Sequence, residues 1–152
     1  MRYILVAVGR IKSGPEKQLV ETYAQRLGSR LELIEVENKK TTSPAEGKRR
    51  EADLIRAAIP PGAFVVALDE HGKGLTSTLF ASKMAAWRDS GIPMIAFVIG
   101  GADGLDQDFL SGCDFRLAFG AMTWPHKLVR VLVAEQIYRA ESIQSGHPYH
   151  RV

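Results

Sequence analysis

The chain has 152 residues, 45% of them hydrophobic and 24% charged, which is typical of one ordinary globular domain and excludes a disordered or fibrous protein. No apolar run approaches the roughly 18 residues of a membrane-spanning helix, and the single cysteine, Cys113, excludes an intramolecular disulfide. We therefore expect one cytoplasmic domain over residues 1–152 that does not enter a membrane. The net charge of +3 is a mild bias toward polyanionic partners.

The first half of the chain alternates predicted strands and helices. The run 3–8 is apolar throughout, as in a strand buried on both faces, and no small-residue cleavage site follows it as in a secretion signal. The predicted elements, in chain order, are a strand at 3–8, a helix at 15–27 ended by Gly28, a strand at 31–36, a polar loop at 38–47 and a helix within 45–59.

The second half continues the alternation. Its predicted elements are a strand at 63–68 ended by the polar run 69–74, a helix at 76–90, a strand at 93–99, a turn at 100–104, a short helix capped by Asp106, a strand at 115–118, a loop at 120–125 and a helix at 127–145 ended by Gly146. Alternation with apolar strands predicts an α/β fold, a parallel sheet covered on both faces. Such sheets bind ligands beyond the carboxyl ends of their strands.

One of these strand ends carries the sequence Gly100-Gly101-Ala102-Asp103-Gly104. Paired glycines let a backbone turn sharply and approach a ligand without intervening side chains, although a plain tight turn is the alternative. The spacing GxGxxG fails at Ala102, and GxxxxGK[ST] is absent from the sequence. The sequence therefore argues against a binding site for nicotinamide dinucleotides or nucleoside triphosphates.

The next strand end, from Phe119 to His126, combines small residues with Met122 and Trp124. Loops are normally polar, so this composition indicates either core packing or a bound apolar group. Together with 100–104 it could supply the backbone groups and apolar walls that an adenine ring needs. The sequence leaves both interpretations open.

The last predicted helix is apolar nearly all round over 128–134, which predicts burial in the core or in a subunit interface. Glu135 and Arg139 are spaced i,i+4 in the favourable order. They form either a simple helix salt bridge or a pair whose arginine also contacts RNA phosphate.

Two other regions are rich in cations. The tail His147-Pro148-Tyr149-His150-Arg151-Val152 offers stacking and phosphate-binding groups that suit RNA, whereas His147 and His150 lack further ligands at a metal-binding spacing, so we expect no metal. Lys39-Lys40 and Lys48-Arg49-Arg50 form either a solvated surface or a contact to a polyanion. Without the tail and these clusters, nothing in the residues points to a nucleic acid.

Taken together, these segments resemble the ribosomal large-subunit methyltransferase H family of the SPOUT superfamily. The resemblance is carried by Ala67-Leu68-Asp69, Ile99 to Leu105, Thr123-Trp124-Pro125-His126, Leu128 to Ala140 and His147 to Arg151. It implies an S-adenosylmethionine-dependent enzyme that methylates N3 of a pseudouridine in 23S ribosomal RNA, within the large subunit or the assembled ribosome. The competing classes are a non-catalytic RNA-binding module and a small-molecule nucleotide enzyme.

The resemblance also implies a C-terminal trefoil knot and a homodimer in which the partner's C-terminal segment completes each site. The cofactor-contacting positions it implies are Leu68, Gly100, Gly101, Gly120, Ala121, Met122, Thr123, Trp124 and Pro125. The RNA-facing positions are His126, Arg139, Tyr149, His150 and Arg151, and among these Arg139, Tyr149 and His150 are implied to be catalytic. The acceptor of the N3 proton stays open between His150, His126, Glu135 and solvent.

Overall fold

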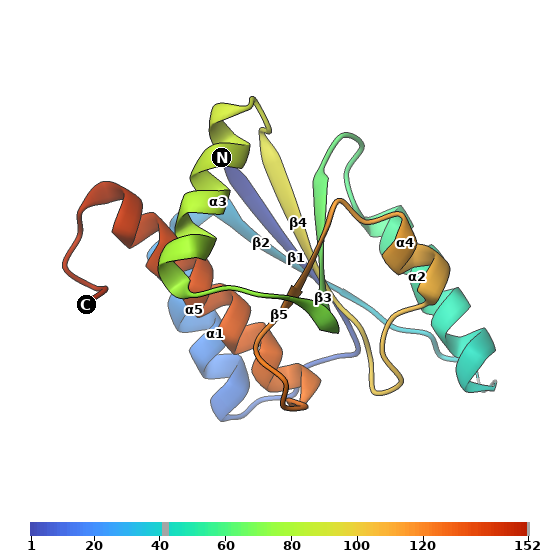
Figure 1. Ribbon diagram of the computed structural model, residues 1–152. Coiled ribbons are helices and arrows are strands. Elements are labelled where there is room, and N and C mark those ends of the chain that lie inside the picture. The colour runs from blue at the N-terminus through green and yellow to red at the C-terminus, as the bar shows by residue number, and fades with distance from the viewer. Residues whose placement is uncertain (41–42, 152) are drawn as a thin grey trace.

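The computed structural model describes residues 1–40 and 43–151, organised around one five-stranded parallel sheet (Figure 1). The strands are β1 (Arg2–Val8), β2 (Leu31–Val36), β3 (Phe64–Gly74), β4 (Met94–Ile99) and β5 (Phe115–Ala118). Their order across the sheet is β2-β1-β4-β3-β5, and all four adjacent pairs run parallel. The predicted parallel α/β fold is confirmed.

Helices cover both faces of this sheet (Figure 1). They are α1 (Pro15–Leu27), α2 (Pro44–Ala58), α3 (Ser77–Asp89), α4 (Gln107–Ser111) and α5 (His126–Ser145), and a 3-10 turn, η1 (Gly28–Arg30), follows α1. Helices α1, α3 and α5 share one face, and α2 and α4 share the other (Figure 1). Because β1 and β4 lie between two helical layers, their side chains are buried on both faces, which explains their continuous apolar runs.

Local signals place most helix ends. Asp106 accepts a hydrogen bond from the Phe109 amide at 3.3 Å, which confirms the predicted cap of α4. Ser43 caps α2 in the same way, so that helix begins at Pro44, inside the polar loop predicted at 38–47. Residues 41–42 of that loop and Val152 of the predicted tail lie outside the described residues.

The predicted end of the third strand at Leu68 is wrong. Strand β3 continues to Gly74, and both Leu68 and Lys73 pair with Leu117 of β5, so the residues between them form a bulge. A Cβ atom on Gly72 would lie 2.8–2.9 Å from the backbone of Arg116 and Leu117, so the two segments approach this closely only because residue 72 is glycine. The run 69–74 has the composition of a turn, but pairing with β5 overrides that local preference.

Helix α5 begins at His126, one residue before the predicted start, and ends at Gly146, whose φ of 73° is a left-handed conformation favoured by glycine. Its inner side is buried against the sheet, including Val133 and Ile137. Leu128 is 37% exposed in the single chain, so the core buries one side of the first turns, and burial of the other side in a subunit interface stays a prediction. In the part of the chain that the structure describes, no helix is long and apolar enough to cross a membrane.

Candidate functional site

A cavity of about 490 Å³ lies at the carboxyl edge of the sheet, where the parallel-strand architecture predicts a ligand site. The segments that follow β4 and β5, together with the bulge in β3, form its wall. Its apolar lining includes Leu68, Ile99 and Leu117, and its polar lining includes Asp69 and Asp103.

The glycine turn after β4 presents bare backbone to this cavity. Its ends are joined by a bridge between Gly101 and Gly104, whose amide donates to the Gly101 carbonyl at 3.0 Å. A Cβ atom on Gly100 would lie 2.9–3.0 Å from the backbone of Gly104, a contact that real side chains essentially never make. Closure of the turn therefore requires a residue without a side chain at position 100.

The loop after β5 is open to solvent in the single chain. Met122 is 77% exposed and Trp124 is 44% exposed, although both line the cavity. The Trp124 indole donates to the Phe119 carbonyl at 3.0 Å, which fixes the ring across the loop. Core packing, one of the two interpretations open from sequence, does not account for these two side chains.

The structure separates the predicted site residues into two groups. Those that line the cavity are Leu68, Gly100, Gly101, Gly120, Met122, Thr123, Trp124 and His126. Ala121 is exposed and Pro125 is the N-cap of α5, and neither lines the cavity. Arg139, Tyr149, His150 and Arg151 lie elsewhere. Because Arg139 is thirteen positions beyond His126 on α5, the two are about 20 Å apart along the helix axis.

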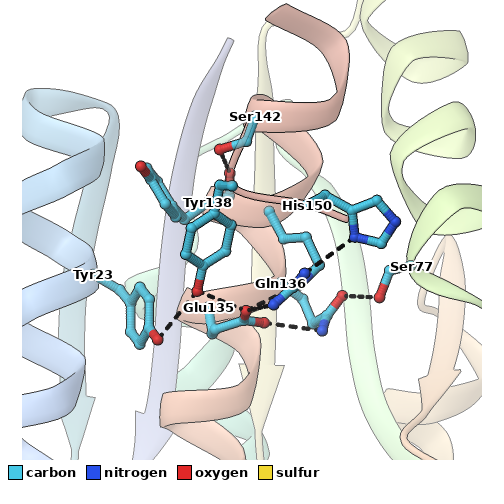
Figure 2. A network of polar contacts seen from close by, with 9 residues as sticks. Tyr23, Ser77, Glu135, Gln136, Tyr138, Ser142 and His150 are labelled. Atoms are coloured by element: carbon cyan, nitrogen blue, oxygen red, sulfur yellow. Dashed lines mark hydrogen bonds and ion pairs between the residues drawn. The ribbon is translucent and has the colours of Figure 1, made fainter. Parts of the chain in front are cut away.

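The second group forms a hydrogen-bonded cluster centred on Glu135 (Figure 2). Arg139 donates to Glu135 Oε1 from Nε at 3.0 Å and from Nη2 at 2.5 Å. The Tyr149 hydroxyl donates to the same oxygen at 2.9 Å and lies 3.3 Å from the hydroxyl of Tyr23 on α1. The predicted Glu135–Arg139 salt bridge is confirmed.

The same cluster orients His150. Arg139 Nη1 lies 3.1 Å from His150 Nδ1, and because a guanidinium only donates, Nδ1 is the acceptor and the ring proton is on Nε2. The Arg139 guanidinium also lies over the Tyr149 ring, 4.8 Å from its centroid. The hydrogen bond to Glu135 raises the pKa of Arg139, and burial, with the Tyr23 and Glu135 hydrogen bonds, raises the pKa of Tyr149.

A relay of amide and hydroxyl groups fixes the Glu135 carboxylate from the other side. Gln136 donates to Glu135 Oε2 at 2.9 Å, and Ser77 of α3 donates to Gln136 at 2.8 Å (Figure 2). Glu135 is therefore held by groups from α1, α3, α5 and the tail. Of the residues in this network, Arg139 and Tyr149 were predicted from the sequence as site residues, and Tyr23, Ser77 and Gln136 were not.

Sequence reasoning also missed an ion pair between a buried arginine and a solvent-exposed carboxylate at the cavity end of α5. Arg130 is only 3% exposed and donates to Glu35 at 2.6 Å and to the carbonyls of Val8 and Gly9 at 3.0 and 2.7 Å. Although burial opposes ionisation of Glu35, the Ile11 amide and Arg130 lower its pKa. A lone arginine inside the apolar run 128–134 was the available signal.

This ion pair anchors α5 one turn beyond His126, which lines the cavity. Burial, with the positive charges of Arg130 and Lys127, lowers the pKa of His126. Its imidazole is therefore neutral near pH 7 and has a free lone pair. His126 is the one predicted RNA-facing residue that the structure places at the cavity.

Among the described residues, the structure shows neither a metal-binding group nor an activated cysteine. Within residues 1–40 and 43–151, no three His, Cys, Asp or Glu side chains come together as a metal-binding group. Cys113 is the free cysteine of the chain. Burial raises the pKa of its thiol to about 11, and the thiol donates to the Phe109 carbonyl at 3.2 Å, so it is not an activated nucleophile.

The chain as a whole is similar to known proteins. Residues 1–150 match the family described as "Predicted SPOUT methyltransferase". The chain belongs to this family. Among curated relatives of this SPOUT methyltransferase, proteins named "Ribosomal RNA large subunit methyltransferase H" from Rhodospirillum centenum and from Ruegeria sp. are 56% and 50% identical to it, and the alignments cover 99% and 100% of both chains.

A solved structure, a probable methylase family protein from Haemophilus influenzae Rd KW20, has the same fold as this SPOUT methyltransferase. The TM-score is 0.59 at 16% identity, over 99% of this chain and 70% of that chain. At such low identity the likeness concerns the fold alone. Membership of the family makes the chain a methyltransferase, so the competing interpretations as a non-catalytic RNA-binding module and as a nucleotide enzyme fall away.

Proposed function

We propose that this enzyme transfers the methyl group of S-adenosylmethionine to N3 of a pseudouridine in large-subunit ribosomal RNA, in the cytoplasm and on the assembled ribosome. The observation that carries the proposal is the strand-end cavity of a chain that is 56% identical over its length to a protein named as a large-subunit rRNA methyltransferase. We also propose that residues 1–152 act as one domain.

The cavity has the chemistry that S-adenosylmethionine requires. Gly100 and Gly101 line the cavity without side chains of their own, and apolar groups such as Leu68 and Ile99 suit an adenine ring. Asp69 also lines the cavity and suits the positive charges of the cofactor. We therefore assign cofactor contact to the lining residues, and to Ala121 and Pro125 through the loop that carries them.

The bound cofactor supplies a methyl group already activated by its sulfonium, so the protein has mainly to hold the acceptor nitrogen in line with it. The residues of this chain would have to hold N3 in line with the methyl group and supply a base that takes up the N3 proton released on transfer. We propose that Arg139, Tyr149 and Arg151 orient the acceptor nucleotide.

His150 is our proposed proton acceptor. Its Nδ1 lone pair is engaged by Arg139 in the single chain, so the ring can accept a proton only after that contact is exchanged for substrate. The neutral ring of His126 at the cavity is the alternative acceptor, and the two are separated by single-turnover rates of His150→Ala and His126→Ala on saturating ribosomes.

Because about 20 Å of helix separates Arg139 from its own cavity, we propose a homodimer in which each protomer's tail completes the partner's cavity. The exposure of Met122, Trp124 and Leu128 beside the cavity supports a partner on this side. We also propose that the chain is knotted, with the loop after β5 threaded past the β3 bulge. The close approach of Gly72 to the backbone of β5 supports that crossing.

The proposed reaction is tested by mass spectrometry of rRNA nucleosides. Ribosomes from cells that lack this enzyme are incubated with purified protein, with and without S-adenosylmethionine. We expect one methyl group on one pseudouridine of 23S rRNA, only with cofactor present, and none on 16S rRNA from the same ribosomes. Methylation of another nucleoside, or none at all by folded protein that binds the cofactor, would contradict the proposal.

A further inference from the structure

The positive charge of this chain is concentrated in one short segment that the reaction described above does not use. The basic segment consists of Lys39, Lys40, Lys48, Arg49 and Arg50, with Glu46 as its only carboxylate, so residues 39–50 carry a net charge of +4. The whole chain carries +3, and the remaining residues therefore sum to −1. Any attraction of this protein to a polyanion must depend strongly on this segment.

Most of these cations are not neutralised within the fold. Among the described residues, none of Lys39, Lys40, Lys48 and Arg49 has a carboxylate oxygen within 4.0 Å, and only Arg50 pairs, with Glu46 at 2.8 Å. Three exposed arginines at the opposite edge of the sheet do have such partners: Arg2 with Glu32, Arg56 with Asp53 and Arg88 with Asp89, at 3.2–3.5 Å.

Cations of the basic segment also lie close to the carboxylate of Glu46. Arg50 lowers the pKa of Glu46 through its hydrogen bond and its charge, and the charges of Arg49 and Lys40 add to this effect. Lys39, Lys40 and Arg49 are exposed. The segment therefore presents a local excess of positive charge to solvent, not a set of internal ion pairs.

This charge lies beside the cavity. The N-terminal end of α2 and the glycine turn after β4 lie at the same edge of the sheet (Figure 1). The two elements are in contact through the middle of α2, because a Cβ atom on Gly101 would lie 3.4 Å from Glu51 Oε2. Burial, together with the charge of Asp103 in the turn, raises the pKa of Glu51. The cations at positions 48–50 immediately precede Glu51 on α2 and so lie within about one turn of this contact.

We propose that the basic segment binds the phosphate backbone of the ribosomal RNA next to the methylated nucleotide. The proposal rests on the proposed function, since that function brings RNA to the cavity. Every nucleotide of an RNA chain is flanked by phosphates, whatever the sequence of the RNA. Cations beside the cavity therefore contact negative charge whichever nucleotide is bound there. The basic segment thus contributes affinity and salt dependence, and leaves cofactor binding and the chemical step to the cavity and the tail.

The test compares two triple variants that each lose three positive charges. Lys39→Gln/Lys40→Gln/Arg49→Gln removes the exposed, unpaired cations of the basic segment. Arg2→Gln/Arg56→Gln/Arg88→Gln removes exposed cations at the opposite edge and is the matched control for net charge. All six side chains are exposed, so both variants should fold. The measurements are KM and kcat on 70S ribosomes, binding to protein-free 23S rRNA at several salt concentrations, and S-adenosylmethionine affinity by calorimetry.

For the basic-segment variant we expect about a tenfold or larger rise in KM and in the RNA dissociation constant, with kcat and cofactor affinity within twofold of wild type. The slope of log affinity against log salt should fall by about 2, since each lost phosphate contact removes roughly 0.7 to 0.9. The control should keep the wild-type slope and a KM within threefold.

Equal effects of the two variants would overturn the proposal, because net charge alone would then explain them. An effect on ribosomes without any effect on protein-free rRNA would also overturn it, since the segment would then contact a ribosomal protein. If wild-type protein methylates no ribosome, the proposed function has failed, and the arm with protein-free rRNA still decides whether the basic segment binds RNA.

Discussion

The two ends of helix α5 are built by different chemistry. At the cavity end, the lining combines the glycine turn with apolar residues such as Leu68 and Met122. At the tail end, Glu135, Arg139 and Tyr149 form a cluster of charged and hydroxyl side chains. Under the function that we propose, the first surface binds the cofactor and the second binds the acceptor nucleotide, and about 20 Å of α5 separates them within one chain.

The largest effect should come from adding a side chain to the glycine turn, at the cavity end of α5. In Gly100→Ala, the new Cβ atom would lie 2.9–3.0 Å from the Gly104 backbone, so the turn must open. Overpacking of this kind costs about 1–3 kcal/mol, and we expect S-adenosylmethionine to bind about 10- to 100-fold more weakly by calorimetry. Gly112→Ala is the control, because its Cβ atom meets nothing closer than 3.7 Å and its φ is −89°. Equal cofactor affinities in the two variants would count against a cavity built by bare backbone.

A smaller effect should follow from removing contacts of the Glu135 cluster, at the tail end of α5. Arg139→Gln removes the charged contacts to Glu135 and His150, and hydrogen bonds to charged groups are worth about 1.5–3 kcal/mol. We expect methyl transfer to ribosomes to fall about 10- to 100-fold while cofactor affinity stays within twofold. Arg26→Gln is the control, because Arg26 lies over the Tyr23 ring at 5.2 Å and makes no hydrogen bond to Glu135. A parallel loss of cofactor affinity in Arg139→Gln would show that the two ends are not separate.

The smallest effect concerns the ion pair that anchors the cavity end. The pKa of Glu35 lies below its ordinary value of 4.5 in the folded state, so its stabilisation is complete above that value and is lost as the pH falls through the folded pKa. Because the carboxylate is 36% exposed, solvent screens it, and we expect Glu35→Gln to lower the free energy of unfolding by only about 1 kcal/mol at pH 7.

Urea titrations at several pH values check this prediction. The difference between wild type and Glu35→Gln should shrink as the pH drops below 4.5. Glu37→Gln serves as the control, because its ion pair with Arg10 is longer, at 3.6 Å, and more exposed. A difference that persists unchanged in acid would mean that Glu35 stabilises the fold by packing and not by its charge.

Most of the fold could be predicted from the sequence because its signals are local. Glycine and proline mark the ends of α1, the side chain of Asp106 caps α4, and continuous apolar runs mark β1 and β4. The extension of β3 to Gly74 could not be predicted, because its polar residues pair with β5, which lies more than 40 positions later in the chain. Long-range pairing leaves no periodic signal in the strand itself.

Only part of the candidate site could be predicted from the sequence, because some of its contacts join residues that are far apart in the chain. Leu68, Gly101 and Gly120 were expected as cofactor contacts from the family resemblance, and all three line the cavity. Arg130 and Tyr23 were missed because their partners, Glu35 and Tyr149, are 95 and 126 positions away. No spacing rule connects such residues, and only the folded chain brings them together.

Complementation between two inactive protomers tests the central claim most directly. One protomer carries Gly100→Ala, the other carries Arg139→Gln with His150→Ala, and the heterodimer is purified through two different tags. If each tail completes the partner's cavity, one of the two sites in the heterodimer has both halves intact, and methyl transfer to ribosomes should reach about half of the wild-type rate. A heterodimer no more active than the two mutant homodimers would contradict a shared site and place the complete reaction within a single chain.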